Sequence, residues 1–84
     1  MIQELTNTQE AFLNDLRDLN TIIMSMDLLQ KKYAYMAPKS QIKRDIDMLV
    51  NDGIVERKIV RCVVHGKIIS KTIYTNKFGS VKNN

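Results

Sequence analysis

The order of turn and helix signals over residues 31–76 constrains the fold of this chain more than any other feature of its sequence. Pro38 favours an extended residue before it and suits the first position of a helix. Apolar residues follow at helical spacing, at Ile42, Ile46, Leu49 and Val50. Gly53 then supplies a left-handed helix stop. We therefore expect a helix over residues 27–33, a turn over 34–37, and a third helix from Pro38 to about Asn51.

A β-hairpin is expected directly after this third helix, with residues 54–64 paired to residues 67–75. His65 and Gly66 form a two-residue turn in this prediction, because glycine accepts a positive φ easily. The register then pairs Val64/Lys67, Val63/Ile68, Cys62/Ile69 and Arg61/Ser70. Since a slip of one residue would invert both faces, the register decides which side chains share a side.

The first helix is expected to begin near Thr6 or Thr8. Thr6 and Gln9 have the spacing of a capping box, in which each side chain satisfies a free backbone N–H. An apolar stripe follows at Phe12, Leu16, Leu19 and Ile23, with Leu13 on its flank. The opposite side is expected to be solvated: Asn14, Asp15, Arg17 and Asp18.

Asn20 and Thr21 are expected to interrupt this helix, and residues 21–24 are β-branched enough for a very short strand. Ser25 then offers a new N-cap, and Asp27 suits a first helical turn. The alternative is an unbroken helix from Thr8 to about Lys32.

Charge is distributed unevenly along the chain. Residues 1–30 hold one basic and five acidic side chains, whereas residues 31–84 hold twelve basic and four acidic ones. The formal net charge of +4 therefore divides into about −4 and about +8. This asymmetry predicts a basic surface for a polyanion.

Residues 26–75 resemble the winged helix-turn-helix superfamily of bacterial, archaeal and phage regulators. The similarity lies in Asp27-Leu28-Leu29, in the turn before Pro38, and in the run of residues 39–55 that ends with Leu49, Gly53, Ile54 and Val55. It implies an α+β winged helix: three helices, a C-terminal hairpin wing and a short strand between the first two helices. We expect one domain over residues 1–84, with flexible ends at 1–5 and 79–84.

The resemblance also implies which residues contact duplex DNA. The third helix would enter the major groove with Lys39, Ser40, Gln41, Lys43, Arg44 and Asp47. Backbone contacts would come from the supporting helix and the wing: Lys31, Lys32, Arg57, Lys58, Arg61, Lys67 and Lys71. Arg44 is the expected base reader because its planar fork matches guanine. Two alternatives are open for Gln41: it reads adenine, or it sits nearer the second helix. Asp47 is expected to accept from cytosine, to orient Arg44, or to mark where the helix leaves the groove.

Apolar side chains near the hairpin tip do not suit a plain DNA-binding wing. Val63, Val64, Ile68 and Ile69 surround the turn on both faces. Either the hairpin packs on the body, near Phe78, or another chain covers it, which predicts a homodimer or a protein partner.

Other site chemistries find little support in the sequence. Cys62 and His65 are the only cysteine and histidine, too few for a zinc site or a base-activated nucleophile, so we expect neither metal nor cofactor nor catalysis. Packing is the expected role of Tyr33, Tyr35 and Tyr74 and of the methionines, Met24 and Met48 foremost.

The sequence as a whole predicts a transcriptional regulator that occupies a promoter or operator on duplex DNA. No leader or membrane span is expected, and the lone Cys62 fits a reducing cytoplasmic or nucleoid setting in a prokaryotic or viral system. The alternatives are a winged-helix protein-interaction module, such as a phage-type protein docked on a host enzyme or polymerase, and an accessory protein of plasmid or phage replication.

Overall fold

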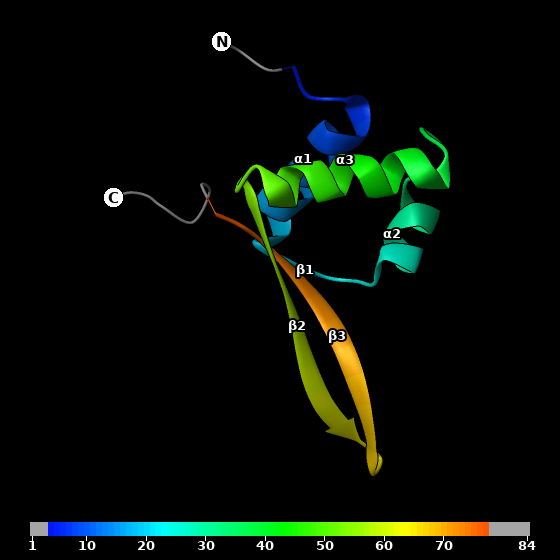
Figure 1. Cartoon of the computed structure of the whole chain (residues 1–84), viewed down its shortest axis with the longest axis vertical. Helices are drawn as coiled ribbons and strands as arrows, with labels where there is room; N and C mark the ends of the chain where they lie inside the picture. Colours follow the sequence, from blue (N-terminus) through cyan, green and yellow to red (C-terminus); the bar gives the residue numbers. More distant parts are fainter. Residues whose placement is uncertain (1–3, 78–84) are drawn as a thin grey trace.

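The structure, a computed structural model, describes residues 4–77. Its elements are α1 (Asn7–Leu19), β1 (Thr21–Ile23), α2 (Met26–Lys32), α3 (Lys39–Asn51), β2 (Val55–Val64) and β3 (Lys67–Asn76). The three strands form an antiparallel sheet in the order β1-β3-β2. The helices gather at one end of the molecule, and the β2–β3 hairpin projects away from them (Figure 1). The architecture is α+β and is compatible with a winged-helix arrangement.

The expected capping box begins α1. The Thr6 hydroxyl accepts from the Gln9 backbone N–H at 3.1 Å, and the Gln9 side chain accepts from the Thr6 N–H at 3.0 Å. Phe12 and Leu16 are buried as expected, but Leu19 is 61% exposed. The apolar stripe stops there because α1 ends at Leu19 and Asn20 turns the chain with a φ of 68°.

The predicted break after α1 is confirmed, and the alternative of one continuous helix is wrong. β1 is one residue shorter than expected and pairs with β3, with Ile22 opposite the buried Tyr74. The hydroxyl of Ser25 accepts from the Leu28 N–H at 3.3 Å and caps α2.

The third helix differs from the prediction in its first residue and in two of its side chains. Pro38 is the N-cap, with extended backbone, and α3 begins at Lys39. Met48, expected in the core, is exposed, whereas Asp45 is buried. The Thr6 hydroxyl donates to the Asp45 carboxylate at 3.0 Å, and the Gln9 side chain donates to the Asp45 backbone carbonyl at 3.1 Å. These bonds fix the start of α1 against α3.

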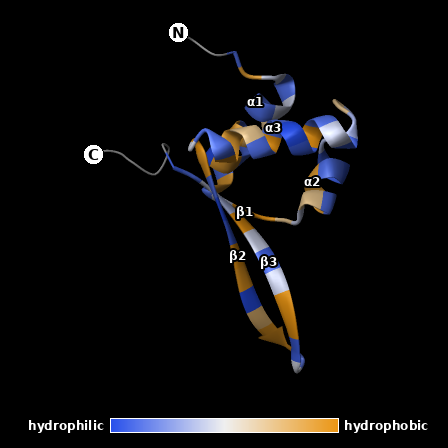
Figure 2. Ribbon diagram, viewed as in Figure 1, coloured by the Kyte–Doolittle hydropathy of each residue, from blue (hydrophilic) through white to orange (hydrophobic). Residues whose placement is uncertain are grey.

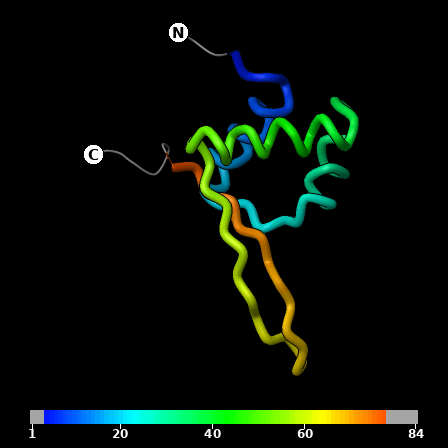
Figure 3. The backbone as a smooth tube through the Cα atoms, viewed as in Figure 1, coloured from blue at the N-terminus to red at the C-terminus, as the bar shows by residue number. Residues whose placement is uncertain are grey.

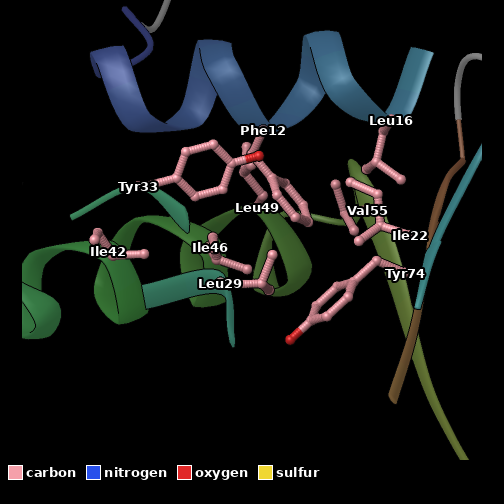
Figure 4. Packing of buried hydrophobic residues seen from close by; sticks show 10 residues of the cluster. All are labelled: Phe12, Leu16, Ile22, Leu29, Tyr33, Ile42, Ile46, Leu49, Val55 and Tyr74. Atoms are coloured by element: carbon pink, nitrogen blue, oxygen red, sulfur yellow. The ribbon is translucent and has the colours of Figure 1, made fainter. Parts of the chain in front are cut away.

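An aromatic cluster joins the helices to the root of the hairpin. The Phe12 ring lies edge-on to Tyr33, with centroids 6.4 Å apart, and to Tyr74, with centroids 5.3 Å apart (Figure 4). Aliphatic side chains from the three helices, β1 and β2 complete the core: Leu16, Ile22, Leu29, Ile42, Ile46, Leu49 and Val55. The hairpin therefore leaves the body at a well-packed point.

The predicted hairpin register is confirmed at every pair. Val64 lies opposite Lys67, and Val63 lies opposite Ile68. His65 and Gly66 both have a positive φ, of 53° and 76°, as a tight two-residue hairpin turn requires. At the root, β2 begins one residue later than expected, at Val55, and β3 extends one residue further than expected, to Asn76, which pairs with Val55.

The far part of the hairpin, residues 60–71, forms a free arm. β1 pairs with β3 only as far as Ile73, and the Met24 N–H adds one bond to the Thr72 carbonyl at 3.2 Å. Beyond that point the arm has two strands. Leu28 of α2 lines a pocket with Ser70 and Lys71 at the base of the arm, and the outer part of the arm runs on without a helix beside it (Figure 3). The expectation that its tip packs on the body is therefore wrong for the described residues, and Phe78 lies outside them, as do the expected flexible positions 1–3 and 79–84.

Candidate nucleic-acid interface

The outer face of α3 carries most of the side chains that the sequence assigned to DNA. Lys39, Ser40, Lys43 and Arg44 are all exposed. Ser40 and Arg44 lie opposite the buried Ile42, Ile46 and Leu49, and Lys39 and Lys43 lie beside that buried face. Gln41 differs, because its amide lies 3.4 Å from the Asp45 carboxylate and is half-buried. It lies beside the start of α1, not near α2 and not on the outer face.

Asp47 forms the connection between α3 and the hairpin. Its carboxylate accepts from Lys43 at 2.7 Å and from Arg57 at 2.8 Å. One role that the sequence left open for Asp47 was to orient Arg44. The hydrogen bonds of Asp47 go to Lys43 and Arg57, not to Arg44. Asp47 instead holds one cation of α3 against one cation of β2, so that both elements present a joined surface.

The Asp47 bridge is reflected in two shifted pKa values. Partial burial by itself would raise the pKa of Asp47, but the hydrogen bonds from Lys43 and Arg57 outweigh it and lower that pKa below its ordinary value of 3.8. The hydrogen bond to Asp47, with a second one involving Tyr74, raises the pKa of Arg57. Arg57 therefore stays charged under all ordinary conditions.

The lowered pKa predicts an acid-sensitive contribution of Asp47 to stability. Above its unfolded value, near 3.8, the carboxylate contributes fully, and the contribution is lost as the pH falls through the lower pKa of the folded state. Between about pH 5 and pH 2, wild-type stability in denaturant titrations should fall more steeply than that of Asp47→Asn. Asp18→Asn is the matched control, because Asp18 is exposed and has no ion pair within residues 4–77. Parallel curves for wild type and Asp47→Asn would contradict the bridge.

The remaining basic residues of the hairpin are exposed and have no ion pair in the part of the chain that the structure describes. They are Lys58, Arg61, Lys67 and Lys71. Side chains alternate along a strand, so Arg61 lies on the same side of β2 as Arg57, the residue held by Asp47. Arg61 therefore continues the positive surface of α3 along one side of the hairpin, whereas Lys58, Lys67 and Lys71 lie on the other side.

The two lysines of α2 have different surroundings. Lys31 is exposed, whereas the ammonium of Lys32 lies 3.7 Å from the Asp15 carboxylate and 5.8 Å from the centre of the Tyr33 ring. Tyr33 also donates a short hydrogen bond to Asp15. Burial, followed by this bond, raises the pKa of Tyr33. Asp15 is therefore a bonding partner between α1 and α2, not the solvated residue that the sequence suggested. Lys32, like Arg57, already has an acidic partner and is less available to a phosphate than Lys31.

The four apolar residues near the tip divide into two sets. Val63 and Ile68 lie opposite each other and are both 72% exposed. Val64 and Ile69 belong to the other side of the ribbon, where each is 38% exposed, beside Val60 and the half-buried Cys62. Hydrophobic and hydrophilic bands are interspersed along the arm in Figure 2. The side chains of the second set lie next to one another along the arm and are partly covered, whereas Val63 and Ile68 form an open apolar pair.

Two predictions about aromatic and ligating residues have different outcomes. Tyr33 and Tyr74 are buried as expected, but Tyr35 is 80% exposed in the turn before α3. Cys62 and His65 lie on the arm, and residues 4–77 contain no group of three or more potential metal-ligating His, Cys, Asp or Glu side chains. No helix within the same residues has the length and apolar character needed to cross a membrane.

Asp45 is the residue of this region that sequence reasoning missed. It lies three positions after Ile42 and one before Ile46, so helical spacing places it on the buried face. An acidic residue inside an apolar stripe signals a buried polar contact, since a buried carboxylate requires hydrogen-bond partners.

Comparison with known proteins adds no assignment, because no protein-family model, curated protein or solved structure matches the chain.

Proposed function

We propose that the protein binds duplex DNA with the outer face of α3 and the hairpin, and that it regulates transcription by occupying its site. The observation that carries this proposal is a set of exposed cations on these elements with no ion pair within residues 4–77: Lys39, Arg44, Lys58, Arg61, Lys67 and Lys71. Uncompensated cations attract the phosphate backbone and release its counterions. Arg61 lies on one side of the hairpin and Lys58, Lys67 and Lys71 lie on the other, so the hairpin offers cations on both sides.

The shape of the surface supports different roles for α3 and for the hairpin. α3 presents a helical face of the width that a major groove admits, and the hairpin extends away from the end of α3 (Figure 1). Arg44 is the exposed arginine of α3, so in this proposal it reads a base edge while the hairpin cations contact phosphates. Two copies bound to a two-fold operator would supply the homodimer expected from the sequence.

A salt titration of DNA affinity tests the proposal. With about four to seven phosphate contacts, the logarithm of affinity should fall with the logarithm of salt at a slope near −0.9 per contact. Fluorescence anisotropy with a labelled duplex measures this slope directly. Arg61→Ala should flatten it by about one contact, while the control Arg17→Ala, on the acidic half of the chain, should leave it unchanged. Undetectable binding at low salt would contradict the proposal.

A protein-interaction module is the second candidate, and the open apolar pair of Val63 and Ile68 favours it. A protein ligand for the arm would need acidic side chains, because Arg61, Lys67 and Lys71 flank the pair and the arm contains no acid. The cations of α3 would then be left without a role, which places this candidate second.

A further inference from the structure

The free arm combines an apolar tip with an entirely basic set of charges. Its charged side chains are Arg61, Lys67 and Lys71, and no acidic residue occurs between Arg57 and Lys77. The tip side chains Val63 and Ile68 are more exposed than any other part of the arm's apolar surface. A ligand for the arm therefore has to offer negative charge and an apolar slot in one place.

The backbone pairing makes Val63 and Ile68 a narrow unit. The Thr72 carbonyl accepts from the Met24 N–H, which lies on the side of β3 away from β2. The N–H and C=O groups of the even-numbered residues of β3 therefore point away from β2. Ile68 therefore belongs to a non-hydrogen-bonded pair with Val63, the kind of pair in which side chains approach most closely. The two side chains form one compact apolar wedge.

The wedge lies on the side of the hairpin that is joined to α3. Alternation along β2 places Val63 on the same side as Arg61 and Arg57, and Arg57 is bonded to Asp47 of α3. The arm is five residue pairs long beyond the last contact with β1, or about 15 Å. A duplex that contacts α3 is thus within reach of the wedge.

We propose that the arm inserts Val63 and Ile68 between base pairs of the bound duplex and unstacks one step. This inference rests on the proposed function and adds a mechanism to it. Apolar side chains that enter the minor groove commonly wedge between base steps and kink the duplex. Arg61, on the same side as the pair, and Lys67 and Lys71, on the other side of the arm, are available to the flanking phosphates. Stacked bases supply the apolar slot, and phosphates supply the negative charge.

Pairing of two arms in a homodimer explains the same surface less well. It would cover the apolar pair, but it would also bring Arg61 of one copy against Arg61 of the other, without an acid on either arm. Like charges opposite one another destabilise paired strands. The charge pattern therefore favours a polyanion over a second copy as the occupant of the tip.

Mismatched DNA provides the first test, because a base step that is already unstacked removes the cost of insertion. Two duplexes of identical flanking sequence are compared, one fully paired and one with a central T·T mismatch. The wild type should prefer the mismatched duplex by about tenfold or more, since unstacking a paired step costs a few kcal/mol. The variant Val63→Thr/Ile68→Thr should bind both duplexes equally while keeping the wild-type salt slope.

Threonine retains the β-branched shape at both positions, so this variant preserves the strand preference of the arm. The matched control is Leu5→Thr/Leu19→Thr, which alters two other exposed apolar residues away from the arm. This control should keep the preference. Permanganate, which oxidises unstacked thymines, gives a second readout on a fully paired duplex with a central TA step: wild type should raise reactivity there and the tip variant should not.

Each alternative has its own result. Wild-type binding with no mismatch preference and no permanganate signal would overturn insertion while leaving DNA binding intact. A wild-type dimer that the tip variant converts to a monomer, with the same DNA behaviour in both, would assign the pair to self-association and also overturn insertion. Absence of any DNA binding would overturn the proposed function and this inference together.

Discussion

Replacing Arg44 by alanine is expected to weaken binding to the preferred duplex by about 1–3 kcal/mol, or roughly 5- to 150-fold, and to relax the base preference at one position. Arg44 is exposed on the outer face of α3 and has no ion pair within residues 4–77. Its neighbour Lys43 is instead held by Asp47. Arg44 is therefore the cation of α3 best placed to give a bidentate contact to guanine.

The measurement for Arg44→Ala is a competition between a randomised duplex library and the bound protein, followed by sequencing of the bound fraction. Lys71→Ala is the matched comparison, because Lys71 is an exposed hairpin cation expected to contact phosphate only. It should weaken all sequences about equally. A uniform loss for Arg44→Ala, with a changed base preference for Lys71→Ala, would show that α3 does not read the major groove.

Replacing Phe12 by alanine is expected to destabilise the protein by about 3–5 kcal/mol, the usual range for removal of a buried aromatic side chain. Phe12 is fully buried and contacts the rings of both Tyr33 and Tyr74. The cavity left by its ring would lie between α1, the end of α2 and the root of the hairpin. In a domain of this size such a loss removes a large share of the total stability.

Urea titrations followed by circular dichroism measure the effect of Phe12→Ala. Leu19→Ala is the control on the same helix, because Leu19 is mostly exposed and its loss should change stability by no more than about 0.5 kcal/mol. Equal costs for the two substitutions would contradict the aromatic cluster as the centre of the core.

The hairpin shows what local sequence determines well. His65 and Gly66 fix the turn, since both must adopt a positive φ, and the turn then sets every pair from Val64/Lys67 to the root. The capping box at Thr6 and the break at Asn20 are equally local, because each depends on residues within one helical turn. These predictions needed no knowledge of the rest of the chain.

Contacts between distant elements account for the predictions that were wrong. Asp45 is buried because Thr6 and Gln9, more than thirty residues earlier, supply its hydrogen bonds. Asp15 leaves the solvated face of α1 because Tyr33 and Lys32 approach it from α2. A helical pattern shows that a residue faces inward or outward, but it does not show which polar partner stands opposite.

The sequence predicted which residues of the candidate site are exposed better than it predicted how they contact one another. The exposed cations of α3 and the hairpin follow from helical and strand spacing. The bridge from Lys43 through Asp47 to Arg57 does not, since it depends on the angle at which β2 leaves α3. The unequal exposure of Val63 and Val64 also depends on the twist of the ribbon, which pairing alone does not specify.

Amide chemical-shift mapping by NMR tests most directly whether α3 and the hairpin form one surface for duplex DNA. On addition of an unlabelled duplex at low salt, resonances of α3 from Lys39 to Arg44 and of the arm from Arg61 to Lys71 should shift together with one apparent affinity. Resonances on the acidic outer side of α1, such as those of Glu10 and Asp18, should stay in place. Shifts confined to α1, or no shifts at any residue, would contradict a nucleic-acid interface on α3 and the hairpin.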